Sequence, residues 1–364
     1  MREIILYFLK IGMFGFGGPM AHIAMMEEEL VKRRRWISEE EFLSGLAVSN
    51  MLPGPASTQL GIYMGYMRKG VLGGILAGIS FILPAFIIII ILSYIYIKYG
   101  TIPQVQGLLY GINPMVIALI SISLYKMSKG VITNVKSFII LLFSATAMYF
   151  LNINIIIILI LSGIVGVLIF HNKFNRNNYY SFLFPVIGFN PIITKLFTFF
   201  LKVGSFIYGG GLVVIPFIEQ EVITNLGWLT QQEFLAGLSL GQITPGPVVI
   251  TSAFIGYKVG GVLGGFVAAF AIFFPSFLFI LIAAPYLKKI RNIPWVKAFL
   301  KGINAAVIGT ILVTTLTLIP GAILDIWTFL IFTLGLIGLL KFKMNVFYSI
   351  GISGILGMVI TYLI

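Results

Sequence analysis

The chain has 364 residues, of which 59% are hydrophobic and only 10% charged, and it contains no cysteine. This composition excludes a soluble globule with a polar skin, and the lack of cysteine excludes disulfides, thiolate nucleophiles and iron–sulfur clusters. The formal net charge is +13, but the basic residues gather in short clusters at the ends of apolar segments, which indicates membrane topology rather than nucleic-acid binding.

The first apolar segment, residues 4–26, is predicted to cross the membrane with a break in its middle. The run from Gly15 to Pro19 interrupts the helix, and proline is favoured at the start of a new one. A helix that restarts there presents free backbone N–H groups and the positive end of its dipole, which suits an anion. The alternative is that these glycines serve close helix packing.

Residues 39–67 are predicted to form a re-entrant hairpin, which enters the membrane and returns on the same side. Otherwise Arg68 and Lys69 would lie opposite the basic loop 32–35, against the positive-inside rule. Prolines at positions 53 and 55 with a glycine between them suit the tip, because they end the helix and permit a tight turn. Non-helical backbone at that depth indicates a substrate pathway, with a packing kink as the alternative.

Four more crossings are predicted at 71–96, 104–125, 137–152 and 154–170, and then the series recurs. Residues 8–55 and 200–247 align without a gap and share 19 of 48 residues. The second half is predicted to cross at 196–218, 262–286, 302–319, 324–340 and 345–364, with a hairpin at 231–257. We assign residues 1–176 and 196–364 to two repeats joined by a linker at 177–195.

Equivalent loops of the two repeats alternate in charge. Loop 32–35 is wholly basic, whereas its counterpart 222–229 has no basic residue. By the positive-inside rule the repeats are upside down relative to each other. We therefore expect an all-α polytopic membrane protein of two inverted-topology repeats, each with five crossings and one re-entrant hairpin, in the cell (plasma) membrane with both termini extracytoplasmic. Hairpins entering from opposite faces would meet near the midplane, as in many inverted-repeat transporters.

The candidate anion-binding residues lie in the first crossings and around the hairpin tips. Lys10 and Lys202 occupy equivalent positions inside the first crossing of each half and could together neutralise a dianion; the alternative is that each snorkels to a headgroup. Backbone groups and neutral side chains complete the set: Gly15, Gly17, Gly18, Asn50, Pro53, Gly54, Pro55, Gln59, Gly209, Gly210, Gln242, Thr244, Pro245, Gly246, Pro247 and Thr251.

Carboxylates are scarce, so proton coupling or gating has few candidate carriers. The repeat-related pairs are Glu27 with Glu219 and Glu41 with Glu233, for which interfacial salt bridges or helix starts are the favoured roles. Asn113 and Asn304 follow Gly-Ile on equivalent crossings and either bond across helices or touch substrate. His22 and His171 have no repeat partner and are expected to be structural. We expect no cofactor and no metal site.

Several of these motifs occur together in one known family. They are Phe8-Leu9-Lys10-Ile11-Gly12, Phe14 to Pro19, Asn50 to Pro55, and Gln59-Leu60 in the first half, with Gly241 to Pro247 and Phe254 to Tyr257 in the second. In combination they resemble the long-chain chromate transporters of the CHR family, over nearly the whole chain. The resemblance implies a two-domain secondary transporter that exports chromate or handles a related oxyanion such as sulfate.

Two other classes stay open at this point. An intramembrane enzyme acting on a phosphorylated lipid could use the glycine breaks to bind phosphate, but the membrane segments carry no constellation of His, Asp and Ser to supply a base or a metal site. A passive channel or lipid scramblase would differ from a coupled carrier by failing to accumulate solute. The expected partners are a small inorganic oxyanion and the lipid bilayer, with no nucleic acid, and a homodimer is left open.

Overall fold

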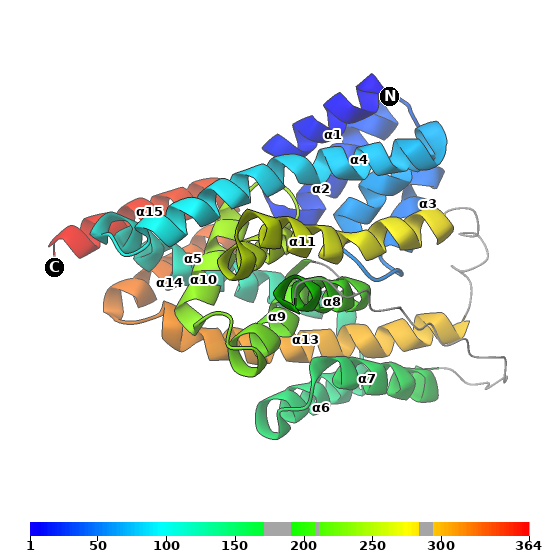
Figure 1. Cartoon of the computed structure of the whole chain (residues 1–364). Helices are drawn as coiled ribbons and strands as arrows, with labels where there is room; N and C mark the ends of the chain where they lie inside the picture. The colour runs from blue at the N-terminus through cyan, green and yellow to red at the C-terminus, as the bar shows by residue number, and fades with distance from the viewer. Residues whose placement is uncertain (171–190, 209–210, 284–293, 364) are drawn as a thin grey trace.

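The computed structural model describes residues 1–170, 191–208, 211–283 and 294–363, and within these ranges the regular elements are all helical (Figure 1). The first half contains α1 (Arg2–Phe14), α2 (Gly18–Met26), the π-helix η1 (Glu27–Arg33), α3 (Glu39–Ser49), α4 (Ala56–Tyr99), α5 (Pro103–Val131), α6 (Val135–Leu151) and α7 (Ile155–Phe170). The predicted all-α class is confirmed for the described residues.

The second half repeats this order. It contains α8 (Pro191–Phe206), the 3-10 turn η2 (Gly211–Val213), α9 (Val214–Glu219), the π-helix η3 (Gln220–Asn225), α10 (Gln231–Ile243), the 3-10 turn η4 (Val248–Ile250), α11 (Thr251–Ala283), α13 (Pro294–Ala322), α14 (Ile326–Leu340) and α15 (Val346–Leu363). Most of the predicted linker lies outside the described residues, and its last five positions, 191–195, begin α8.

Five of the described helices are long and apolar enough to cross a membrane. They are α4, α5, α13, α15 and the segment 248–282 that joins η4 to α11. The helices α6, α7 and α14 are apolar but only 15 to 17 residues long. Their positions agree with the predicted crossings to within a few residues, and the count of ten crossings stays a prediction.

Each long hairpin helix folds back on itself at a glycine. In α4 the backbone leaves the helix at Lys69 and Gly70, where Gly70 has φ +62°, and in α11 it does so at Gly260 and Gly261, again with φ +62° at the second glycine. Residues eight apart would be separated by ~12 Å along a straight helix. Here Gly65 lies directly against the backbone of Gly73, so residues 56–68 return along 71–99.

The two halves exchange helices. Within each half the first helix packs on the hairpin helix, α1 on α4 and α8 on α11, but α5 packs on α14 and α15, and α13 packs on α6 and α7 (Figure 1). Glycines permit these crossings, because a Cβ on Gly111 would collide with the α15 backbone and one on Gly302 would collide with the α7 backbone. The repeats are therefore interleaved, and one hydrophobic cluster draws on both.

Candidate functional site

The Pro-Gly-Pro motif of each half, residues 53–55 (the first tip) and 245–247 (the second tip), contacts the break in the first helix of the other half. The backbone N–H of Gly54 donates to the carbonyl of Ile207 at 2.7 Å, and that of Gly246 donates to the carbonyl of Gly15 at 3.0 Å. In the aligned repeats Gly54 corresponds to Gly246 and Ile207 to Gly15, so the two hydrogen bonds are equivalent. Both tip glycines have positive φ, +135° and +97°, which other residues rarely adopt.

A cavity of 310 Å³ lies beside the second of these contacts, and both Gly15 and Gly246 line it. Among its lining residues are seven that the sequence singled out: Gly15, Gly17, Gly18, Asn50, Gln242, Thr244 and Gly246. They come from the break between α1 and α2, the end of α3, and the tip that follows α10. The structure thus gathers predicted residues from both halves around one space.

Helix N-termini from both halves line this cavity. Gly18 begins α2, Ala56 begins α4, Gly211 begins the η2 turn that leads into α9, and Val248 begins the η4 turn that leads into α11. No side chain caps the start of α2, α4 or η4. Uncapped N-termini leave backbone N–H groups free and present the positive ends of helix dipoles, which is an arrangement that attracts anions.

The charge at the cavity wall is positive. Lys126 on α5 is the one charged side chain among the described lining residues, and Ser123, one turn earlier on the same helix, adds a hydroxyl. No carboxylate belongs to that lining. The sequence does not indicate either residue, because Lys126 directly follows the predicted crossing 104–125, where a basic residue is expected for topological reasons alone.

His22 is a second residue whose place the sequence did not reveal. Its fully buried ring donates from Nε2 to the carbonyl of Gly15 at 2.8 Å, so this carbonyl accepts from both His22 and Gly246. A Cβ on Gly15 would collide with the imidazole, which explains why a glycine stands there. His22 therefore supports the wall of the cavity from behind, and Val214 occupies the aligned position in the second half.

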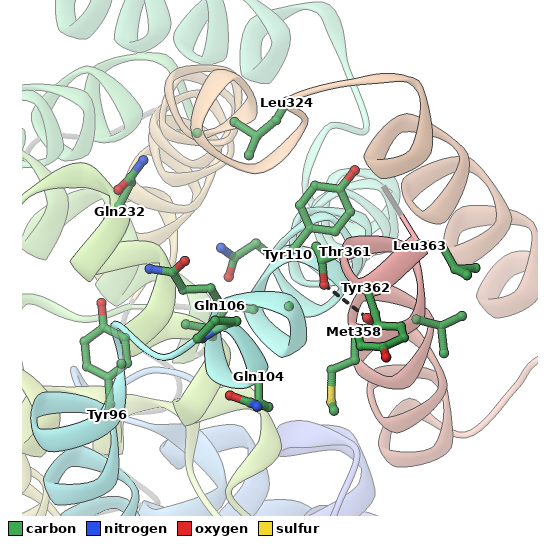
Figure 2. Close-up of a pocket in the computed structure, with 17 residues that line it drawn as sticks. Tyr96, Gln104, Gln106, Tyr110, Gln232, Leu324, Met358, Thr361, Tyr362 and Leu363 are labelled. Atoms are coloured by element: carbon green, nitrogen blue, oxygen red, sulfur yellow. Dashed lines mark hydrogen bonds between the residues drawn. The ribbon is translucent and has the colours of Figure 1, made fainter.

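A larger vestibule of 880 Å³ lies along the first half of α5 (Figure 2). Polar uncharged side chains dominate its polar lining: Tyr96, Gln104, Gln106, Tyr110, Asn113, Gln232 and Thr361. Asn113 also accepts a hydrogen bond from Ser239 of α10 at 2.7 Å between oxygens. Asn113 and Ser123 are ten residues apart, or ~15 Å along a helix, so α5 borders both the vestibule and the cavity.

Other predicted residues lie away from the cavity lining. Lys10 and Lys202 are exposed on α1 and α8, on the sides opposite the buried faces of those helices. Pro53, Gly54, Pro55, Gln59, Pro245, Pro247 and Thr251 are buried in and around the tips without lining the cavity. Gly209 and Gly210 lie outside the described residues. Asn304 lines a smaller cavity of 190 Å³ that it shares with Asn50.

The candidate carboxylates make local structural contacts. Glu41 and Glu233 complete capping boxes with Ser38 and Thr230 at the starts of α3 and α10. Glu233 also pairs with Lys258 at 2.7 Å. Glu27 lies 3.9 Å from Lys32, and Glu219 accepts from the Thr317 hydroxyl at 3.3 Å.

The basic loop after α2 is ion-paired with the acidic residues that precede it. In η1 the Arg34 guanidinium lies 2.7 Å from a Glu29 carboxylate oxygen. The hydrogen bond from Arg34 holds the pKa of Glu29 below its ordinary value, against a smaller opposing effect of desolvation. Glu29 is therefore ionised at neutral pH, and its contacts are those of an ion-pair cluster.

Comparisons with known proteins cover both halves of the chain. The family model described as "Chromate transporter" matches residues 2–167 and 194–358. The chromate transport protein of Cupriavidus metallidurans is 35% identical, over 94% of this chain and 88% of its own length. The probable chromate transport protein of Synechococcus elongatus is 36% identical, over 94% and 89%. An uncharacterized transporter of Methanocaldococcus jannaschii is 30% identical, over 98% and 94%. No solved structure matches the chain.

Proposed function

This chain belongs to the chromate transporter family, and on that premise we propose that it exports chromate across the cell membrane as a secondary active transporter. The observation that carries the proposal is the cavity beside the second tip, where helix N-termini from both halves meet beside a lysine. The family membership makes the protein a transporter rather than an enzyme.

The proposed ligand of the cavity is the chromate dianion. A volume of 310 Å³ is about ten times the ~30 Å³ that a water molecule occupies in the liquid, which leaves room for a tetrahedral oxyanion and a few waters. Free N–H groups at the starts of α2 and α4 would donate to its oxygens. Asn50, Gln242 and Thr244 would add neutral donors, and the charge of Lys126 would favour an anion over a neutral solute.

We further propose that the two repeats are inverted in the membrane. The reciprocal hydrogen bonds of Gly54 and Gly246 support an approximate two-fold relation between the halves. With basic residues placed inside, the vestibule near the start of α5 would open to the outside, and the cavity near Lys126 would lie toward the cytoplasm. Alternating access would then come from movement of one repeat against the other around the tips.

Sulfate is a second candidate substrate of the same site. Backbone N–H groups, amides and one lysine recognise the charge and the tetrahedral oxygens of an anion, and these features are common to sulfate and chromate. The two substrates are therefore compared in one assay.

The test is flux into proteoliposomes that contain the purified protein. Radiolabelled chromate and sulfate are each supplied with and without a pH gradient, and accumulation above the external concentration separates a coupled carrier from a channel. Gln242→Leu removes a cavity donor and is expected to weaken chromate affinity about tenfold or more, the equivalent of one hydrogen bond to a charged group, ~1.5–3 kcal/mol. Gln220→Leu, on the half-buried η3 and outside the cavity lining, is the matched control and is expected to keep wild-type flux.

Saturable chromate flux that Gln242→Leu weakens and Gln220→Leu does not would support the assignment. Absence of flux for both anions in folded protein would overturn it. Flux of sulfate but not of chromate would show that sulfate is the substrate of this site.

A further inference from the structure

The two hairpin tips are not chemically equivalent. At the second tip, residues 245–247, the Gly15 carbonyl accepts from both Gly246 and His22, and the hydroxyls of Thr244 and Thr251 donate to backbone carbonyls at 2.8 and 2.9 Å. The one unpartnered atom of His22 is a nitrogen, Nδ1. At the first tip, residues 53–55, Val214 stands in place of the histidine. The Ile207 carbonyl therefore receives the N–H of Gly54 but no imidazole.

Unpartnered buried oxygens surround the first tip instead. Gln59 and Ser276 are both fully buried, and neither Gln59 Oε1 nor Ser276 Oγ has a hydrogen-bond partner among the described residues. Gln59 Nε2 donates to the carbonyl of Pro53 at 2.6 Å, which leaves Oε1 as the free end of the amide. A buried polar group without a hydrogen-bond partner destabilises the fold, so both atoms call for one.

The Gln59 amide and the Ser276 hydroxyl lie together at Gly54. A Cβ added to Gly54 would collide with Gln59 Nε2 and with Ser276 Oγ, so both side chains border the same face of this glycine. The residue aligned with Ser276 is Ala85, and a Cβ on Gly246 would meet its methyl group at 3.0 Å. The second tip thus rests on an apolar surface, whereas the first tip rests on a polar one.

We propose that the first tip is a binding site for Na⁺. The groups around it are an amide oxygen, a hydroxyl and the backbone carbonyls of Pro53 and Ile207, and hard cations prefer such oxygen ligands. Ile207 directly follows α8, so the negative end of that helix dipole adds to the attraction. None of these ligands is a carboxylate, so a monovalent ion balances the site better than a divalent one. Unwound backbone beside helix C-termini holds Na⁺ in other inverted-repeat transporters.

A bound ion there would couple to the anion cavity through α4. Ala56 lines the cavity and Gln59 lies one turn further along the same helix. At the second tip, the Gly15 carbonyl has two partners, the N–H of Gly246 and the imidazole of His22. At the first tip, the ion would be the second partner of the Ile207 carbonyl, beside the N–H of Gly54. Na⁺ would then hold the first tip docked while chromate occupies the cavity, an extension that rests on the proposed function.

The direct test is the melting temperature of the purified full-length protein in NaCl, compared with KCl and choline chloride at equal ionic strength. When Na⁺ is in tenfold excess over its Kd, linkage predicts a rise of about 2–4 °C that saturates with concentration. Ser276→Ala, which copies Ala85 of the second tip, is expected to abolish the rise. Ser162→Ala removes another buried unpartnered hydroxyl, on α7, and is expected to keep it.

Gln59→Glu keeps the side-chain size and adds a negative charge, so it is expected to lower the Na⁺ concentration at half-maximal stabilisation at least tenfold. This variant keeps the test decisive if Ser276→Ala fails to fold. Wild-type protein that transports chromate but shows no Na⁺-specific stabilisation would overturn the site and leave ordered water as its occupant. A Na⁺ effect that Ser276→Ala abolishes, in protein without chromate flux, would uphold the site while the substrate assignment fails.

Discussion

Lys126→Gln tests whether the positive charge beside the cavity selects the anion. The substitution keeps a long polar side chain on α5 and removes the one charge found among the described lining residues. A sphere of 310 Å³ is ~8 Å across, so an ammonium at the wall lies no more than about that far from a bound dianion. Their attraction at 8 Å is ~1 kcal/mol in a water-like medium and ~4 kcal/mol at an effective dielectric constant of 20.

The exposure of Lys126 decides between these limits. Because its side chain is exposed, solvent screens it, and the lower value is the appropriate one. We expect Lys126→Gln to raise the Kd for chromate about fivefold at low ionic strength, and the difference from wild type to shrink in 0.5 M salt. Equilibrium binding of radiolabelled chromate to purified protein measures both effects.

Lys129→Gln is the matched control, because Lys129 lies one turn further along α5, stacks on Tyr125 and does not line the cavity. It is expected to change the Kd less than twofold. Equal weakening by both substitutions would refute the reasoning, since it would show a general effect of net charge instead of a local one. Unchanged binding in Lys126→Gln would show that the lysine does not face the anion.

The remaining predictions concern the tip, the outer lysines and the vestibule. Gly246→Ala introduces a Cβ at φ +97° and 3.0 Å from Ala85, and is expected to cut chromate flux at least tenfold. Gly70→Ala, with φ +62° and open space around it, is the control and is expected to retain flux and lose only ~1 kcal/mol of stability. Equal losses of flux in the two variants would contradict the docking role of Gly246. Lys10→Ala and Lys202→Ala are expected to leave the chromate Kd within twofold of wild type, because both side chains lie off the cavity lining, and a tenfold loss would return them to the site. Asn113→Leu leaves the Ser239 hydroxyl without its acceptor and is expected to lower the melting temperature by about 2–4 °C, a shift that would be absent if water replaced the bond.

The helix breaks and tips could be predicted from the sequence because they depend on local backbone chemistry. Glycine at positive φ interrupts a helix and proline removes a backbone donor, so the clustered glycines and prolines of 15–19 and 53–55 indicate these features directly. The duplication adds that the two tips occupy corresponding positions in the repeats. The gathering of Asn50, Gln242 and Thr244 in one cavity followed from both signals together.

The contribution of α5 could not be predicted in the same way. Which side chains of α5 face the cavity depends on the exchange of helices between the halves, and no local pattern encodes that packing. From the sequence alone, Lys126 therefore indicates which end of the crossing faces the cytoplasm, but not that it lines a cavity. The exposed position of Lys10, in contrast, can be read from the sequence. The buried residues of α1 recur at Ile4, Phe8 and Ile11, and position 10 lies on the opposite side of the helix.

The central claim is that the cavity beside the second tip holds the transported anion, and protection of a single cysteine tests it most directly. The chain has no cysteine, so Ser123→Cys places the sole thiol on the cavity wall, and Ser128→Cys places one outside it on the same helix. Chromate oxidises thiols, so the protecting anion is molybdate or sulfate, whichever competes with chromate in the flux assay. We predict that this anion slows alkylation of Ser123→Cys and leaves that of Ser128→Cys unchanged. Equal alkylation rates of Ser123→Cys with and without the anion, in protein that still transports chromate, would contradict the account and place the binding site elsewhere.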